Sequence, residues 1–181
     1  MKIVAVIGSP RKDGSSTKIT EAILKGAREA GHEIREYRIN EMNIMGCQAC
    51  RTCKENGIDC VLDDDLKPYW KDLHEADLLI VSAPNYCSQV CGPMITYMNR
   101  HFCIISKDGQ TTLEPGKTKL IGVFAQGGPV EAGNRADQNY DWFLGDFLAR
   151  KTVLLKKIVV GRNSDLDKEI RDAYELGRSL S

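Results

Sequence analysis

The chain has 181 residues, 42% of them hydrophobic, which suits one core and a single domain over residues 1–181. Its 25 Lys and Arg residues balance 25 Asp and Glu residues, so it lacks the basic field with which proteins bind nucleic-acid backbones. No apolar run approaches the ~20 residues of a membrane span, and a strand-like run from Lys2 leaves no room for a signal peptide, so we expect a cytoplasmic protein with no nucleic-acid or membrane partner.

Apolar runs mark the strands of a buried parallel sheet. The run KIVAVIGS at 2–9 is nearly continuous and rich in β-branched residues, as in strands covered on both faces. In residues 33–40 apolar side chains alternate imperfectly with charged ones, which predicts a partly solvated edge strand. Further buried strands are expected at 77–86 and 119–128, and a last strand is expected at 152–161.

Helical patterns separate these strands. Residues 15–31 have hydroxyl side chains where a helix cap belongs, apolar residues at helical spacing, and Gly31 as a stop. Other helices are expected at 63–76, 92–102, 137–151 and 164–180. The alternation predicts an α/β fold, a doubly wound three-layer sandwich whose five-stranded parallel sheet has the flavodoxin-like order 2-1-3-4-5.

The loop at 9–17 follows the first strand, at the edge where such folds bind ligands. Ser9, Ser15, Ser16 and Thr17 offer hydroxyls, and Gly14 permits a tight turn before a helix amino terminus. This arrangement indicates a phosphate site. The loop lacks the Rossmann and Walker glycine patterns, which weakens dinucleotide and P-loop interpretations, and an ordinary capped helix remains the alternative.

Two more loops at this edge, 83–94 and 125–133, are rich in Gly, Pro, Asn and Gln. Their backbone amides are suited to hydrogen-bond the edge of a planar ring, and Tyr86 to pack on its face. A flavin is such a ring, although simple turns are the alternative. Cys87 and Cys91 are expected to be buried small hydrophobic residues without a catalytic role.

Four cysteines occupy the segment 46–61, directly after the predicted edge strand. Cys47, Cys50, Cys53 and Cys60 have the compact spacing that binds a [4Fe–4S] cluster, with the last thiolate completing the set. Zinc more often takes two separated pairs, and reduced free thiols are the other alternative. The carboxyl ends of parallel strands share one edge, so we expect these cysteines at the same edge as the flavin loops, though at its outer position.

In this order GSPRKDGSST, the cysteine run, SAPNY and AQGG resemble the iron–sulfur flavoproteins, a branch of the flavodoxin-like NADPH-dependent FMN reductase family. The resemblance implies non-covalent FMN, a [4Fe–4S] cluster on the four cysteines, and a homodimer or homotetramer in which a cluster approaches the flavin of another subunit. The chain departs from the pattern in its long last spacing and in Cys87 and Cys91, which stand where related reductases usually carry an aromatic and a small residue.

The resemblance also assigns residues to the flavin. The FMN phosphate would be held by Ser9, Arg11, Gly14, Ser15, Ser16 and Thr17, and the isoalloxazine would be surrounded by Pro84, Asn85, Tyr86, Ser88, Gln126, Gly127 and Gly128. We therefore expect an FMN-dependent oxidoreductase whose cluster exchanges electrons with FMN, with ferredoxin or NAD(P)H as redox partner. A cluster-free NAD(P)H-dependent FMN or quinone reductase is one alternative, and a non-enzymatic zinc- or phosphate-ligand-binding module is another.

Overall fold

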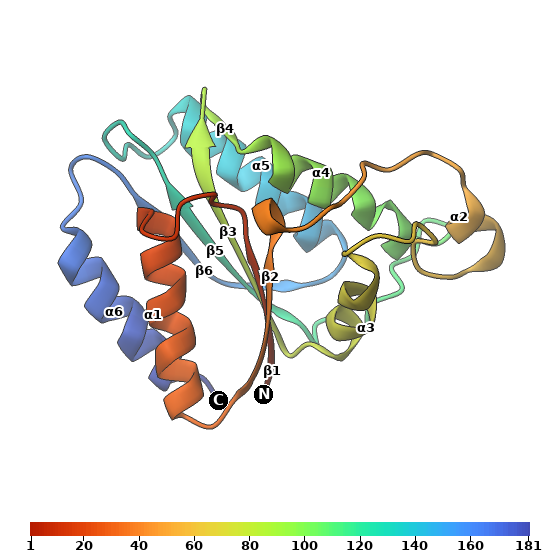
Figure 1. Ribbon diagram of the computed structural model, residues 1–181, viewed down its shortest axis with the longest axis horizontal. Coiled ribbons are helices and arrows are strands. Elements are labelled where there is room, and N and C mark those ends of the chain that lie inside the picture. The colour runs from red at the N-terminus through yellow and green to blue at the C-terminus, as the bar shows by residue number, and fades with distance from the viewer.

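Five parallel strands form a twisted sheet in the order β2-β1-β3-β5-β6 in the computed structural model, which describes residues 1–181 (Figure 1). The strands are β1 (Lys2–Ile7), β2 (Glu33–Arg38), β3 (Leu78–Tyr86), β5 (Lys119–Ala125) and β6 (Val153–Val160). The strand β1 is buried and apolar after Lys2, and the first six residues of its neighbour β3 are buried, as expected of strands covered on both faces. The edge strand β2 is partly exposed.

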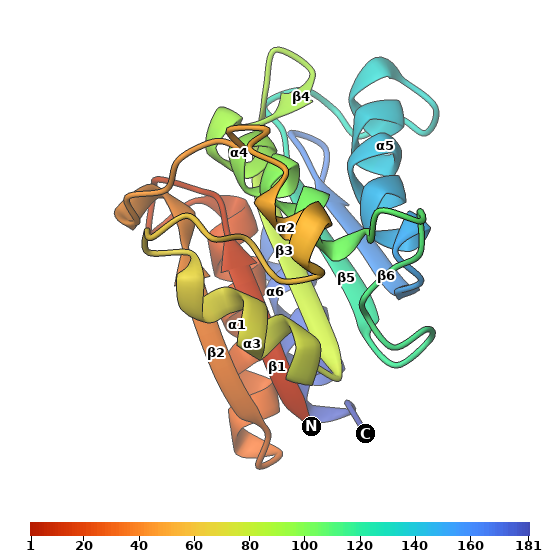
Figure 2. The ribbon, with the colours of Figure 1, turned by 90° about the vertical axis from the view of Figure 1, so that its right-hand side faces the viewer.

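Helices cover both faces of this sheet. The helices α1 (Ser15–Glu29) and α6 (Leu166–Arg178) lie on one face, and α3 (Lys67–Glu75), α4 (Gly92–Arg100) and α5 (Arg135–Ala149) lie on the other (Figure 1). The short elements are η1 (Ile39–Glu41), α2 (Thr52–Asn56) and η2 (His101–Ile104). Figure 2 shows α2 on the outer side of the sheet, between α3 and α4. None of these helices combines the length and apolar composition needed to cross a bilayer.

The predicted fold class and strand order are confirmed. The structure adds a two-residue strand, β4 (Gln89–Val90), which pairs antiparallel with the end of β3 and was not predicted. The predicted hydroxyl cap of the first helix was wrong, because α1 begins at Ser15 with Gly14 as its cap and no side chain caps it. The helix predicted from residue 63 begins later, at Lys67, and Asp64 and Asp65 before it accept hydrogen bonds from the backbone of Met45 and Asn43.

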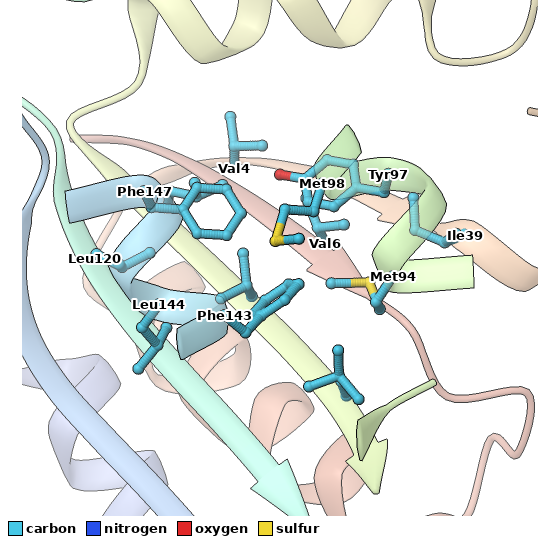
Figure 3. Close-up of a cluster of buried hydrophobic side chains, with 14 of the residues drawn as sticks. Val4, Val6, Ile39, Met94, Tyr97, Met98, Leu120, Phe143, Leu144 and Phe147 are labelled. Carbon is cyan, nitrogen blue, oxygen red and sulfur yellow. The ribbon is translucent and has the colours of Figure 1, made fainter. Parts of the chain in front are cut away.

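The hydrophobic core has two parts, one on each face of the sheet. The larger part lies under α3, α4 and α5 and includes Val4, Val6, Met94, Tyr97, Met98, Phe143 and Phe147 (Figure 3). The smaller part lies under α1 and α6, where Gly26 and Gly177 let the two helix backbones meet. A Cβ atom on Gly177 would lie 2.0 Å from the Ile23 carbonyl oxygen. This helix crossing therefore requires glycine.

A chain of polar groups runs through the larger core part. The Tyr69 hydroxyl lies 2.5 Å from the Tyr97 hydroxyl and 2.8 Å from His101 Nε2, while His101 Nδ1 lies 3.1 Å from the Tyr97 carbonyl oxygen. Since a carbonyl only accepts, Nδ1 carries the proton and Nε2 accepts from Tyr69. Burial, aided by the charge of Arg150, lowers the pKa of His101 to about 3. The imidazole is therefore held neutral in the folded chain.

This neutral histidine predicts a loss of stability in acid. The unfolded chain binds a proton on His101 near its ordinary pKa of 6.5, whereas the folded chain does not until about pH 3. Between these values the unfolding free energy should fall by up to about 1.4 kcal/mol per pH unit from this group alone. Urea unfolding of the wild type and His101→Gln at pH 7, 6, 5 and 4 measures it. The difference between the two proteins should change steadily below pH 6.5, and a constant difference would contradict the assignment.

Candidate functional site

The loop between β1 and α1 presents an anion site. Thr17 Oγ1 donates to the Arg11 carbonyl oxygen at 2.9 Å, and Arg11 N donates to Ser9 Oγ at 3.2 Å, so the loop folds back onto the helix. The first turn of α1 has neither a side-chain cap nor an acidic residue. The N–H groups of its first residues are thus free, at the positive end of the helix dipole. These features suit a phosphate group.

The end of β3 forms the second wall through the hairpin that joins it to β4. Asn85 Oδ1 accepts a hydrogen bond from Ser88 N at 3.1 Å, which fixes the side chain of Asn85. The other end of this amide, Nδ2, is buried and lies near the Tyr140 hydroxyl, but it makes no hydrogen bond of normal geometry. Because a buried unpaired donor is costly, Nδ2 marks a position where a ligand acceptor would be stabilised.

The hairpin turn itself is made by Cys87 and Ser88, both with positive φ, at 53° and 62°. This geometry strains non-glycine residues by ~1–2 kcal/mol each. Cys87 is exposed, so the prediction that it would be a buried hydrophobic residue was wrong. Cys91 is buried as predicted, and its Sγ donates to the Gly8 carbonyl oxygen at 3.1 Å.

The third wall comes from the loops after β5 and β6. Tyr140 donates its hydroxyl proton to Gln126 Oε1 at 2.8 Å, and burial raises the pKa of Tyr140 to about 12, so this donor stays protonated. Arg162 N donates to the Gly128 carbonyl oxygen at 2.9 Å, which ties the two loops together. A Cβ atom on Gly161 would lie 2.4 Å from the same oxygen, so only glycine permits this approach.

These walls enclose a cavity of about 670 Å³ at the carboxyl edge of the sheet. Its lining comprises Ser9, Arg11, Gly14, Ser15, Ser16, Pro84, Asn85, Tyr86, Ala125, Gln126, Gly127, Gly161 and Arg162. Most of the predicted flavin residues are therefore brought together, and the lining contains two arginines but no acidic residue. The exposed Tyr86, with 51% of its surface accessible, stands at the rim.

Three predicted residues lie outside this lining. Thr17 is buried behind the loop that it holds, whereas Ser88 and Gly128 line an adjoining hollow of about 440 Å³ that also includes Asn85 and Arg135. Gly161 and Arg162 were missed. The signal for them was their position directly after the last strand, at the same edge as the other loops.

The four predicted cysteines line one small pocket elsewhere on the chain. After β2 the chain passes through η1, and the segment 43–65, which contains α2, projects beside the carboxyl end of α4 (Figure 1). Its pocket is lined by Cys47, Gln48, Cys50, Arg51, Cys53, Cys60, Val61, Leu62, Arg100, Phe102 and Cys103. Cys103 thus lines the pocket as well, which the sequence spacing did not indicate.

The cavity and the cysteine pocket share no residue. Helix α4 begins beside the cavity, next to Cys91, and ends at Arg100 in the cysteine pocket. Its nine residues span about 13 Å at 1.5 Å per residue. The expectation that the cysteines stand at an outer position, away from the flavin loops of the same chain, agrees with this separation.

Comparison with known proteins gives the family. The model of the NADPH-dependent FMN reductase family matches residues 1–161. The chain belongs to the NADPH-dependent FMN reductase family. Within this FMN reductase family it is 35% identical over 100 residues to an iron–sulfur flavoprotein of Archaeoglobus fulgidus, covering 55% of the chain and 45% of that protein. It is 30% identical over 128 residues to an iron–sulfur flavoprotein of Methanosarcina thermophila, covering 71% and 66%. The chain thus spans about half to two thirds of the length of the curated relatives it matches.

Solved structures show the same fold. An NAD(P)H:quinone oxidoreductase from Methanothermobacter marburgensis superposes with a TM-score of 0.77 at 18% identity, covering 99% of this chain and 95% of that one. An FMN-dependent NADH-azoreductase from Bacillus anthracis, in complex with FMN, superposes with a TM-score of 0.70 at 13% identity, covering 98% and 96%. At these identities the likeness concerns the fold of this FMN reductase-family chain.

The cavity of this FMN reductase-family chain fits FMN. Its volume lies within the ~300–1,000 Å³ of small-molecule sites. The free N–H groups of α1 and the two arginines suit the phosphate dianion, while the unpaired Asn85 Nδ2 suits an acceptor on the ring edge. The phosphate and the edge of the ring thus each have matching chemistry in the lining.

The cysteine pocket fits an iron–sulfur cluster in its donor set. It offers sulfur ligands in an apolar lining, and thiolates are the ligands that iron–sulfur clusters take. The space between the side chains is only about 10 Å³, and no three His, Cys, Asp or Glu side chains are arranged to hold one metal ion. The donor atoms are therefore those that an iron–sulfur cluster takes, and in this structure they are not yet gathered around one point.

Proposed function

We propose that this chain is an FMN-dependent oxidoreductase that passes electrons between a [4Fe–4S] cluster on Cys47, Cys50, Cys53 and Cys60 and FMN in the 670 Å³ cavity. The observation that carries the flavin is the unpaired Asn85 Nδ2 in a lining that also contains a free helix amino terminus. The gathering of four cysteines in one pocket supports the cluster.

The protein residues have distinct tasks in this proposal. Ser15, Ser16 and Arg11 would bind the phosphate, and Asn85 would orient the ring while Tyr86 covers part of its face. FMN, when bound, supplies one- and two-electron chemistry, and the amides around its ring decide which redox forms are stable. Because the two sites of one chain lie at opposite ends of α4, a homodimer or homotetramer would bring a cluster closer to a flavin of a partner subunit.

The electron source is proposed as ferredoxin or NAD(P)H, in a reducing cytoplasm that would keep the cysteines unpaired. One observation favours NAD(P)H and a cluster-free FMN or quinone reductase as the second candidate. The hollow of about 440 Å³ that joins the cavity beside Asn85 offers room for a second planar molecule next to the flavin.

Cofactor analysis of anaerobically purified protein tests these functions. We expect flavin absorption over a broad shoulder near ~400 nm and about four irons per chain. Flavin without iron after anaerobic reconstitution would leave the cluster-free reductase. Zinc without flavin would contradict both candidates and favour a non-enzymatic binding module.

Serine variants identify the ligands in the same experiment. Cys50→Ser should lose most of its iron, because a serine hydroxyl is a poor substitute for a thiolate ligand. Cys103→Ser is the matched control, since Cys103 lines the same pocket but is buried and donates its Sγ proton to the Arg100 carbonyl oxygen at 3.4 Å. Equal iron loss in both variants would show that the assignment of ligands is wrong.

A further inference from the structure

One arginine lies beneath the cysteine pocket and contacts three parts of its segment. The side chain of Arg100, the last residue of α4, is 0% exposed. Its Nε donates to Cys60 Sγ at 3.3 Å, and its Nη1 donates to the Met45 carbonyl oxygen at 2.8 Å and to Asp64 Oδ2 at 2.5 Å. A buried guanidinium is costly unless it is paired in this way.

The partners of Arg100 join the two ends of the cysteine segment, residues 43–45 and 64–65. Asp64 Oδ2 also accepts from Met45 N at 3.0 Å, and Asp65 Oδ2 accepts from Asn43 N at 2.6 Å. Although burial opposes its ionisation, hydrogen bonds from Arg100 and Met45 lower the pKa of Asp64. The segment 43–65 is thus a loop whose two ends are bound to each other and to one buried cation.

A second cation, Lys54, attaches the middle of the segment to the chain that follows α4. Lys54, which follows Cys53, is buried, and its Nζ donates to the carbonyl oxygens of Phe102 and Ile105. The same Nζ lies 4.0 Å from the centroid of the Phe102 ring. Lys54 therefore contacts Phe102 and the backbone that follows it. Of these two cations, Arg100 is the one that hydrogen-bonds a cysteine sulfur and, through Met45 and Asp64, both ends of the segment.

We propose that Arg100 is the positioning residue of the cysteine pocket: it holds the segment 43–65 in place before any cofactor binds, and it donates an N–H hydrogen bond to the sulfur of Cys60. The second part rests on the proposed cluster. A positive charge and a hydrogen bond at a ligand sulfur stabilise the more negative, reduced form of a cluster and raise its reduction potential. Cys60 would be the fixed ligand, to which the other three cysteines add.

Hydrogen–deuterium exchange of the iron-free protein tests the first part without any cluster. In Arg100→Gln the amides of 43–65 should exchange about tenfold faster or more, because the segment loses the buried ion pair between Arg100 and Asp64. Arg150→Gln is the matched control, since Arg150 is another buried arginine paired with an aspartate, Asp146, and does not contact this segment. Arg100→Gln combined with Asp64→Asn guards against a folding defect caused by the unpaired carboxylate.

Faster exchange confined to 43–65 in the Arg100 variants would support the proposal. Unchanged exchange there, or the same change in Arg150→Gln, would overturn it. In the loaded protein the Arg100 variants should show a cluster potential more negative than that of the wild type, and an equal potential would overturn the hydrogen bond to the ligand. If the wild type takes up no iron, the proposed cluster is wrong, and the exchange result still decides whether Arg100 holds the segment.

Discussion

The Ser15→Asp variant is expected to bind FMN about 100-fold more weakly than the wild type while binding riboflavin equally well, because like charges a few ångströms apart near a surface repel by several kcal/mol. Ser15 is the first residue of α1 and lines the cavity where the phosphate is proposed to bind. Riboflavin lacks the phosphate and would not meet the new carboxylate. Quenching of flavin fluorescence during titration of the apoprotein gives both dissociation constants.

The same substitution should not harm the fold. A carboxylate at a helix amino terminus stabilises a protein by ~0.3–1 kcal/mol through the helix dipole. Ser15→Asn, which is neutral and of similar shape to Asp, is the control and should bind FMN within a few-fold of the wild type. Equal weakening of FMN and riboflavin binding would show that the phosphate binds elsewhere.

Gly177→Ala is expected to lower the unfolding free energy by about 3 kcal/mol, since a methyl group forced against backbone cannot be relieved by a rotamer change. The new Cβ would lie 2.0 Å from the Ile23 carbonyl oxygen and 3.0 Å from Ala27 N, so α1 and α6 must separate. In a chain of this size the melting temperature should fall by about 6–12 °C. Urea unfolding gives the free energy directly.

A second glycine provides the control. Gly145 lies inside α5, and a Cβ atom there would meet nothing within 4 Å. Gly145→Ala should therefore raise the unfolding free energy by ~0.4–1 kcal/mol through helix propensity and reduced freedom of the unfolded chain. If both alanine variants change stability in the same direction, the close crossing of α1 and α6 does not control the stability of this face.

The strand order and the cavity walls were predictable because they depend on local patterns. Buried strands such as β1 and β3 are continuous apolar runs, and the carboxyl ends of parallel strands meet at one edge whatever the loops contain. The loops after β1, β3 and β5 are therefore predictable as the ligand-binding loops from the strand pattern alone. Gly161 and Arg162 were not predicted, because Gly161 continues the apolar run of the last strand and so resembles its final residue.

The interactions around the cysteines depend on distant pairs that no local pattern contains. Arg100 ends an amphipathic helix, where an arginine is normally solvated, and it is buried against partners 36 to 55 positions away, Asp64, Cys60 and Met45. Lys54 is likewise buried by carbonyls 48 and 51 positions away. The hydroxyl residues at 15–17 suggested a cap, yet the backbone turns at Gly14 and leaves the helix amino terminus uncapped.

The hydrogen bond between Asn43 and Asp65 makes the segment 43–65 a unit that related chains could lose as a whole. Because the two ends of the cysteine segment are hydrogen-bonded to each other, the segment could be lost in evolution with little disturbance to β2 or α3. Its loss would nevertheless remove the hydrogen bonds that Arg100 makes to Cys60, Met45 and Asp64. We therefore expect a related chain that lacks the segment 43–65 to carry another residue in place of Arg100.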